Sequence, residues 1–114
     1  MRIRLAERFG DTIVSGEAGE ELCQEIAAAL SRKDRVTLDF AGVAVILSAF
    51  LNPAIGGLYK SLSADLVDRA VTMENGSKLQ QSSFDAAKES GRQYYNDARA
   101  RTRREAAITD LIAG

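Results

Sequence analysis

The chain has 114 residues, a mass of 12.3 kDa, a formal net charge of -1 and a hydrophobic content of 46%. A chain of this length can bury about two thirds of its unfolded surface in one domain without covalent cross-links. It has one cysteine, Cys23, and no histidine, which excludes an intramolecular disulfide, a Cys/His zinc site and catalysis by an imidazole base. We therefore expect a protein that is not an enzyme and that holds no metal or cofactor.

Charge and hydropathy are distributed unevenly along the chain. Residues 1–90 carry 10 basic and 13 acidic side chains, whereas residues 91–114 carry 5 and 3. The large apolar residues crowd residues 3–73. No stretch approaches 18 consecutive apolar residues, and no apolar signal segment follows the basic start of the chain. These features predict a cytoplasmic protein with no export signal and no membrane span.

The first half of the chain predicts strands around one helix. Residues 3–14 suggest two short strands joined by a Gly-Asp turn, and hence a β-hairpin. Residues 17–33 place apolar side chains four apart opposite an acidic face, which is typical of an amphipathic helix. Residues 36–40 alternate between apolar and polar, as a half-buried strand does. Residues 43–47 form an apolar run too short for a helix.

The second half of the chain predicts helices around one strand. Residues 51–66 repeat leucine and isoleucine at three and four residues, which predicts one long helix with a continuous apolar stripe. Residues 71–74 alternate as a strand does, and residues 77–114 favour a helix with a thin stripe that Gly91 interrupts. The expected order is β-β-α-β-α-β-α, an α/β sandwich with at least one parallel crossover.

Residues 36–52 resemble a motif of STAS domains, the sulfate-transporter and anti-sigma-factor-antagonist fold. The closest resemblance is to bacterial STAS-like families of unknown function. In those families a strand ending in Asp plus Leu or Phe is followed by Gly-Val, a few apolar residues and a serine at the start of the next helix. Asp39, Gly42 and Ser48 occupy these positions.

The resemblance covers residues 3–90. It implies a STAS-like domain over residues 1–91, with helices packed on a mixed sheet. Residues 92–114 lie beyond this domain and are expected to form a C-terminal helical extension. It also implies a regulatory, protein-binding function in a bacterial signalling or defence switch. STAS-like proteins of this kind are often paired with an ATPase of the histidine-kinase-like fold, which is the expected partner.

Ser48 is the candidate phosphate acceptor. In anti-sigma-factor antagonists a partner kinase of the histidine-kinase-like fold phosphorylates the serine at this position. Those proteins have Asp-Ser-Ser-Gly there, whereas this chain has Leu-Ser-Ala-Phe. The alternative is that Ser48 is only a helix cap. The residues expected to contact the partner are Leu47, Ala49, Phe50, Asn52, Gly56 and Gly57.

Local chemistry predicts where the helix after Ser48 begins. A proline inside a helix removes one backbone hydrogen bond, whereas proline is favoured at the first helical position. We therefore expect Asn52 to cap the helix and Pro53 to follow as its first residue, so that residues 48–51 form an irregular or 3₁₀ entry segment at the surface. A small nucleotide bound at this loop is an alternative function.

Four further residues have structural interpretations. Gly56 and Gly57 reduce helix propensity, which predicts a close backbone approach to the sheet, to a partner or to a second copy of the chain. Asp39 is expected to accept hydrogen bonds from the turn that follows its strand. Cys23 lies on the apolar side of its helix, as a small core residue does.

The C-terminal segment contains one dense basic run. The four arginines of this run are Arg99, Arg101, Arg103 and Arg104. They favour a solvated or protein-docking helix, and nucleic-acid binding is the alternative, because no aromatic residues are interleaved with them. Apolar residues follow the run at Ile108, Leu111 and Ile112. They are expected to fold back on the domain or to dock on a second copy.

Overall fold

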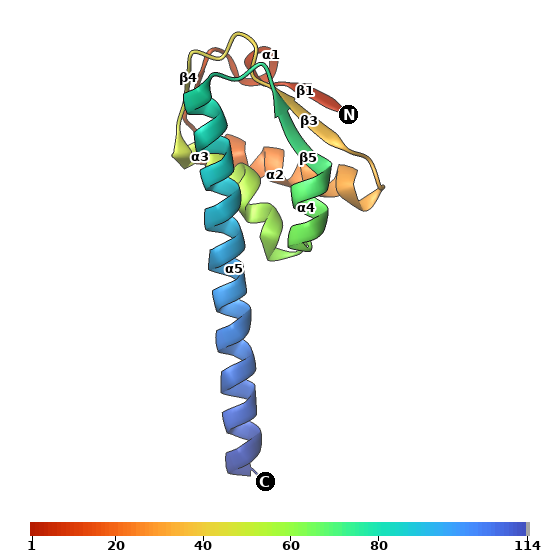
Figure 1. Ribbon diagram of the computed structural model, residues 1–114, viewed down its shortest axis with the longest axis vertical. Helices are drawn as coiled ribbons and strands as arrows, with labels where there is room; N and C mark the ends of the chain where they lie inside the picture. The colour runs from red at the N-terminus through yellow and green to blue at the C-terminus, as the bar shows by residue number, and fades with distance from the viewer. Residues whose placement is uncertain (114) are drawn as a thin grey trace.

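The computed structural model describes residues 1–113, with side chains for residues 1–96, as two parallel sheets and a set of helices (Figure 1). The elements in chain order are β1 (Arg2–Arg4), α1 (Leu5–Phe9), β2 (Thr12–Ile13), α2 (Gly16–Ser31), β3 (Val36–Asp39), β4 (Val45–Ile46), α3 (Ser48–Ile55), the 3₁₀ helix η1 (Gly56–Lys60), α4 (Ala64–Ala70), β5 (Val71–Glu74) and α5 (Lys78–Ala113). The α/β class is therefore confirmed, and so are the helix expected at 17–33 and the strands expected at 36–40 and 71–74.

The larger sheet has the strand order β1-β3-β5, with both pairs parallel. Its register places Ile3 beside Leu38 and Leu38 beside Met73, so the apolar side chains share one face. Arg2 and Thr72 lie on the opposite face, which is exposed. Parallel sheets are usually covered on both faces. Here the helices cover only the apolar face, and the polar face is open to solvent.

The predicted hairpin and the predicted mixed sheet are both wrong. β1 pairs with β3, and β2 pairs with β4, each in parallel. Residues 5–9 form α1 instead of continuing a strand, because Leu5 and Phe9 are one helical turn apart and both pack on the core. Gly10 ends α1 with a φ of 87°, a conformation that glycine adopts without steric cost.

The predicted long helix over 51–66 is also wrong, because the structure divides it into α3, η1 and α4. Gly56 and Gly57 begin the 3₁₀ helix at the point where helix propensity is lowest. Ser63 then starts α4, and its hydroxyl accepts a hydrogen bond from the backbone N–H of Leu66 at 3.3 Å. The apolar spacing persists through all three segments because each buries side chains in the same core.

Helix α5 packs along α3 and η1 (Figure 1). Gly91 does not interrupt this helix, which continues across the proposed domain boundary at 91/92. Gly91 instead lies against Gly56. No helix in the described part of the chain combines the length and apolar character needed to cross a membrane.

Polar contacts also hold α5 in place. The Tyr59 hydroxyl donates to Asp68 Oδ1 at 2.5 Å, and Arg92 of α5 donates to the same oxygen at 3.2 Å. Burial and the Asp68 contact raise the pKa of Tyr59. Lys88 Nζ donates to the Val71 carbonyl of β5 at 2.7 Å, and burial lowers the pKa of Lys88. These contacts link η1, α4 and β5 to α5.

Candidate protein-interaction surface

An exposed apolar face lies on the two-stranded sheet of β2 and β4. Thr12 is aligned with Val45, and the backbone N–H of Leu47 donates to the Ile13 carbonyl at 3.0 Å. Because side chains alternate along a strand, Val14, Val45 and Leu47 lie on the outer face, with 46%, 43% and 47% of their surfaces exposed. We call these three residues the β2–β4 patch. Clustered exposed apolar side chains are typical of an interaction surface.

Helix α3 begins directly beside this patch, at Ser48. Its N-cap residue is Leu47, which makes no side-chain cap hydrogen bond. By contrast, α2 is capped by Ser15 and α4 by Ser63. Ser48 is exposed at the first helical position, so the interpretation of its hydroxyl as a cap is wrong. The first turn of α3 therefore combines an exposed hydroxyl with backbone N–H groups that no side chain caps.

The predicted helix start at Asn52 is wrong as well, because Pro53 lies inside α3. Tertiary packing explains this outcome better than local propensity does. A Cβ added at Gly19 of α2 would lie 2.4 Å from the Phe50 carbonyl oxygen, and one at Gly16 would lie 3.4 Å from the Ala49 oxygen. The backbone of α2 thus approaches the first turns of α3 closely and holds residues 48–52 in the helix.

Two serines at neighbouring helix starts give a matched stability test. Ser15→Ala should lower the free energy of unfolding by about 1 kcal/mol, because Ser15 Oγ accepts the Ala18 N–H at 3.2 Å. Ser48→Ala should change it by less than about 0.5 kcal/mol, because Ser48 is exposed and makes no cap hydrogen bond. Urea unfolding followed by circular dichroism measures both. An equal loss for the two variants would show that Ser48 caps α3.

The structure separates the predicted partner-contact residues into two groups. Leu47, Ala49 and Asn52 are exposed, and Asn52 lies one helical turn after Ser48. Phe50 is fully buried, with its ring 5.2 Å from that of Phe9, and Gly56 is buried too. The exposed surface of this segment therefore does not include Phe50 or Gly56.

The close approaches predicted for the two glycines exist, but their partners differ from those expected. A Cβ on Gly91 would lie 2.5 Å from the Gly56 Cα atom. A Cβ on Gly57 would lie 3.2 Å from Cys23 Sγ. Within the chain, Gly56 thus packs on α5 and Gly57 on α2, rather than on the sheet. Burial raises the pKa of the Cys23 thiol, in agreement with its role as a core residue.

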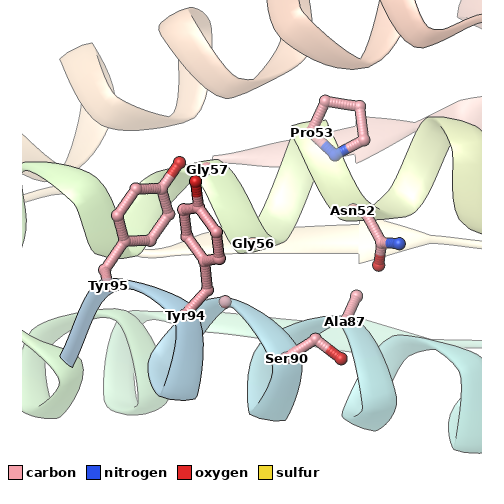
Figure 2. A pocket seen from close by; sticks show the side chains of 9 residues that line it. Asn52, Pro53, Gly56, Gly57, Ala87, Ser90, Tyr94 and Tyr95 are labelled. Carbon is pink, nitrogen blue, oxygen red and sulfur yellow. The ribbon is translucent and has the colours of Figure 1, made fainter. Parts of the chain in front are cut away.

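An uncharged groove of about 440 Å³ follows α3 along its contact with α5 (Figure 2). Figure 2 shows Tyr94 and Tyr95 projecting from α5 beside Gly57, with Asn52 and Ser90 on opposite sides of the groove. The two tyrosine rings meet edge to face at 4.9 Å. The groove therefore offers aromatic surface and neutral hydrogen-bonding groups, and none of its lining residues is charged.

Sequence reasoning missed Val14, Val45 and Tyr94 as surface residues, and it missed the half-buried Tyr95 beside the groove. One signal could have found the region: residues 40–59 contain no charged side chain, in a chain where 27% of the residues are charged. An uncharged stretch of this length contains more residues than the core can bury. Its exposed members form the outer surface of β4 and α3.

Asp39 has the structural role predicted for it, at the end of β3. Its Oδ1 accepts from Asn75 Nδ2 at 2.9 Å and from the Ala41 N–H at 3.0 Å, and its Oδ2 accepts from Arg2 Nη1 at 3.0 Å. Arg2 also donates to Glu74. These donors, with Asn75 first, hold the pKa of Asp39 below its usual range. The carboxylate thus joins β1, β3 and the turn after β5.

This network predicts a pH-dependent loss of stability. A carboxyl whose pKa is lowered by folding stabilises the fold above its unfolded pKa of about 4, and the stabilisation is lost as the pH falls through the folded pKa. Asp39→Asn should therefore lower the Tm at pH 7, and the difference from wild type should shrink below about pH 4. Thermal unfolding at several pH values measures this. A difference that stayed constant with pH would exclude the ionised carboxylate as its cause.

Two groups of residues that the sequence singles out lie in the C-terminal part of α5. The side chains of Arg99, Arg101, Arg103 and Arg104 lie outside the described residues, and so do those of the apolar residues at 108–112. Within the part of the chain that the structure describes, no three His, Cys, Asp or Glu side chains gather where they could hold a metal ion.

The chain has a parallel α/β fold with a serine at the start of the helix after β4. A family model described as a STAS-like domain of unknown function (DUF4325) matches residues 18–81, which is more than half of the chain. The chain therefore belongs to this family, and the resemblance noted in the sequence is confirmed. No curated protein and no solved structure matches the chain.

Proposed function

We propose that this STAS-like domain is a non-enzymatic regulatory module that binds a protein partner through the β2–β4 patch and the exposed side of α3. The observation that carries the proposal is that the three exposed apolar side chains include Leu47, which directly precedes the exposed Ser48 at the start of α3. A partner could cover the patch and reach Ser48 in the same contact. In this arrangement the chain supplies the docking surface and the hydroxyl, and the partner supplies any catalysis.

The proposed partner is an ATPase of the histidine-kinase-like fold, in a bacterial signalling or defence switch. Its support is the position of Ser48, which is the site of phosphorylation in the anti-sigma-factor antagonists that the sequence resembles. A phosphate there would add nearly two negative charges beside the apolar patch, at the N-terminus of α3, where the helix dipole favours negative charge. Such a change would alter the affinity of an apolar contact, which is what a switch requires.

The docking surface can be tested with two matched strand residues. Val45→Asp places a carboxylate in the β2–β4 patch, and Thr72→Asp places one at an exposed position on the open face of the larger sheet. Affinity purification from the native host, with mass spectrometry, identifies the ATPase, and titration of the purified pair measures affinity. We expect Val45→Asp to weaken binding at least about tenfold and Thr72→Asp to leave it unchanged. Equal effects of the two changes would rule out the β2–β4 patch as the docking surface.

Phosphorylation is tested separately from docking. The purified partner, ATP and Mg²⁺ are incubated with the wild-type chain and with Ser48→Ala, and tryptic peptides are searched for the mass of one phosphoryl group. We expect the modification on the peptide that contains Ser48 and its loss in the variant. Partner binding by wild type without modification of Ser48 would retain the docking proposal and refute the phosphorylation proposal.

A further inference from the structure

A second cleft lies in the region where α2 turns into β3. This turn is at the opposite end of α2 from strand β4 (Figure 1). Because α2 has 16 residues, the two regions are separated by about 24 Å. The cleft has a volume of about 470 Å³ and lies between the end of α2, the turn into β3, and α4. Buried Leu30 and Ala70 and half-buried Leu66 give it an apolar floor.

The rim of this cleft carries a net positive charge. Lys33, Arg35 and Arg69 line it, and none of them forms an ion pair with a carboxylate within the described residues. Asp34 is the one acidic residue there, and it faces Arg32 Nε at 3.7 Å. The described arginines that do pair with carboxylates are Arg2, Arg4, Arg8, Arg32 and Arg92. Among the arginines whose side chains the structure describes, the two without a carboxylate partner thus share one cleft.

The backbone turn places the lysine at this rim. Lys33 has a φ of 67°, in the left-handed region where glycine is the usual residue after a helix. The Lys33 N–H donates to the Leu30 carbonyl at 3.0 Å, and the Asp34 N–H donates to the Ala29 carbonyl at 3.0 Å. These carbonyls at the C-terminal end of α2 are therefore already hydrogen-bonded, which reduces their repulsion of an anion. A lysine occupies a position where glycine would be more stable.

We propose that this cleft binds a phosphate monoester that carries an apolar ring. The charges of Lys33, Arg35 and Arg69 suit a ligand with a phosphate dianion better than a ligand with a single carboxylate. The guanidinium group of an arginine can donate two parallel hydrogen bonds to phosphate oxygens. The apolar floor of Leu30, Leu66 and Ala70 would receive the ring. The volume lies within the range of small-molecule sites, which is about 300–1,000 Å³. The site is independent of the proposed docking surface, and its ligand class differs from the protein partner proposed there.

The test uses 1-naphthyl phosphate as the probe and isothermal titration calorimetry as the measurement. Inorganic phosphate and 1-naphthol are the two comparison ligands, since each supplies half of the proposed chemistry. We expect the probe to bind at least about tenfold more tightly than either of them, and its affinity to fall as salt is raised. Equal affinity for inorganic phosphate, or no binding of the probe at millimolar concentration, would overturn the proposal.

Three variants locate the binding site. Lys33→Gly should lower the affinity for the probe at least about fivefold. It should maintain or raise the stability of the fold, because glycine suits the left-handed turn. Arg69→Gln should lower the affinity for the probe by a similar factor. Arg4→Gln is the matched control, because Arg4 is exposed and already pairs with Glu7 at 3.5 Å. Unchanged affinity in both cleft variants, or an equal loss in Arg4→Gln, would place the binding elsewhere and refute the site.

Discussion

Replacing Gly91 with alanine is expected to destabilise the protein and to push α5 away from η1. The new Cβ would lie 2.5 Å from the Gly56 Cα atom and 2.6 Å from the Gly56 carbonyl oxygen. Both are backbone atoms, so no side chain can rotate to relieve the contact. Overpacking of this kind costs about 1–3 kcal/mol. A glycine-to-alanine change inside an exposed helix would instead raise the free energy of unfolding by about 1 kcal/mol. The sign of the measured change therefore shows whether Gly91 is in close contact with Gly56.

Gly57→Ala is the matched control for this prediction. Its Cβ would meet only Cys23 Sγ, at 3.2 Å, and that atom belongs to a side chain. We expect a smaller effect on the free energy of unfolding, measured with urea, than for Gly91→Ala. Because Gly91 also lines the groove beside the two tyrosines, tyrosine fluorescence should change in Gly91→Ala. If Gly91→Ala stabilised the protein, the close contact between α5 and η1 would be disproved.

Phe50→Ala is expected to destabilise the protein more than the truncation of any exposed apolar side chain. The Phe50 side chain is fully buried and packs edge to face on Phe9. Removal of a buried phenylalanine costs about 3–5 kcal/mol, out of a total stability that is typically about 5–15 kcal/mol. The variant should therefore unfold at much lower urea concentration, or fail to fold at 37 °C.

Leu47→Ala is the contrasting change three residues earlier. Because nearly half of the Leu47 side chain is exposed, its truncation should alter the free energy of unfolding by less than about 0.5 kcal/mol. Under the proposed function it should instead weaken partner binding. The two variants thus separate core packing from docking within one short segment. A large stability loss in Leu47→Ala would show that this residue belongs to the core.

Local sequence signals identified the elements whose own periodicity is clear. The helix over 17–33 has an unbroken four-residue apolar repeat, and its observed bounds are Gly16–Ser31. The strands over 36–40 and 71–74 alternate cleanly and end at turns that the structure retains. In these segments the pattern of burial and the intrinsic preference agree, so the prediction required no knowledge of distant contacts.

The errors arose where distant contacts override local preference. Asn52 and Pro53 are a favourable helix start, yet α2 packs so closely on the preceding residues that α3 begins at Ser48. Gly56 was expected to approach the sheet, a partner or a second copy, but its neighbour within the chain is Gly91, on a later helix. The sequence does not show which residues 35 positions apart will meet. It could nominate Ser48 and Leu47 for the surface, but it could not show that Phe50 faces the core.

The parallel pairing of all the strands has a consequence for the order in which the protein can fold. Arg2 is aligned with Thr37, Thr12 with Val45, and Val36 with Val71, so strands that pair are more than 30 residues apart. No strand in the described part of the chain can pair with its neighbour in sequence as a hairpin does. Distant pairings of this kind form slowly, because a long loop must close first. During synthesis, therefore, β1 must wait for β3 to emerge before it has a partner, and the helices between them are the structures that can form first.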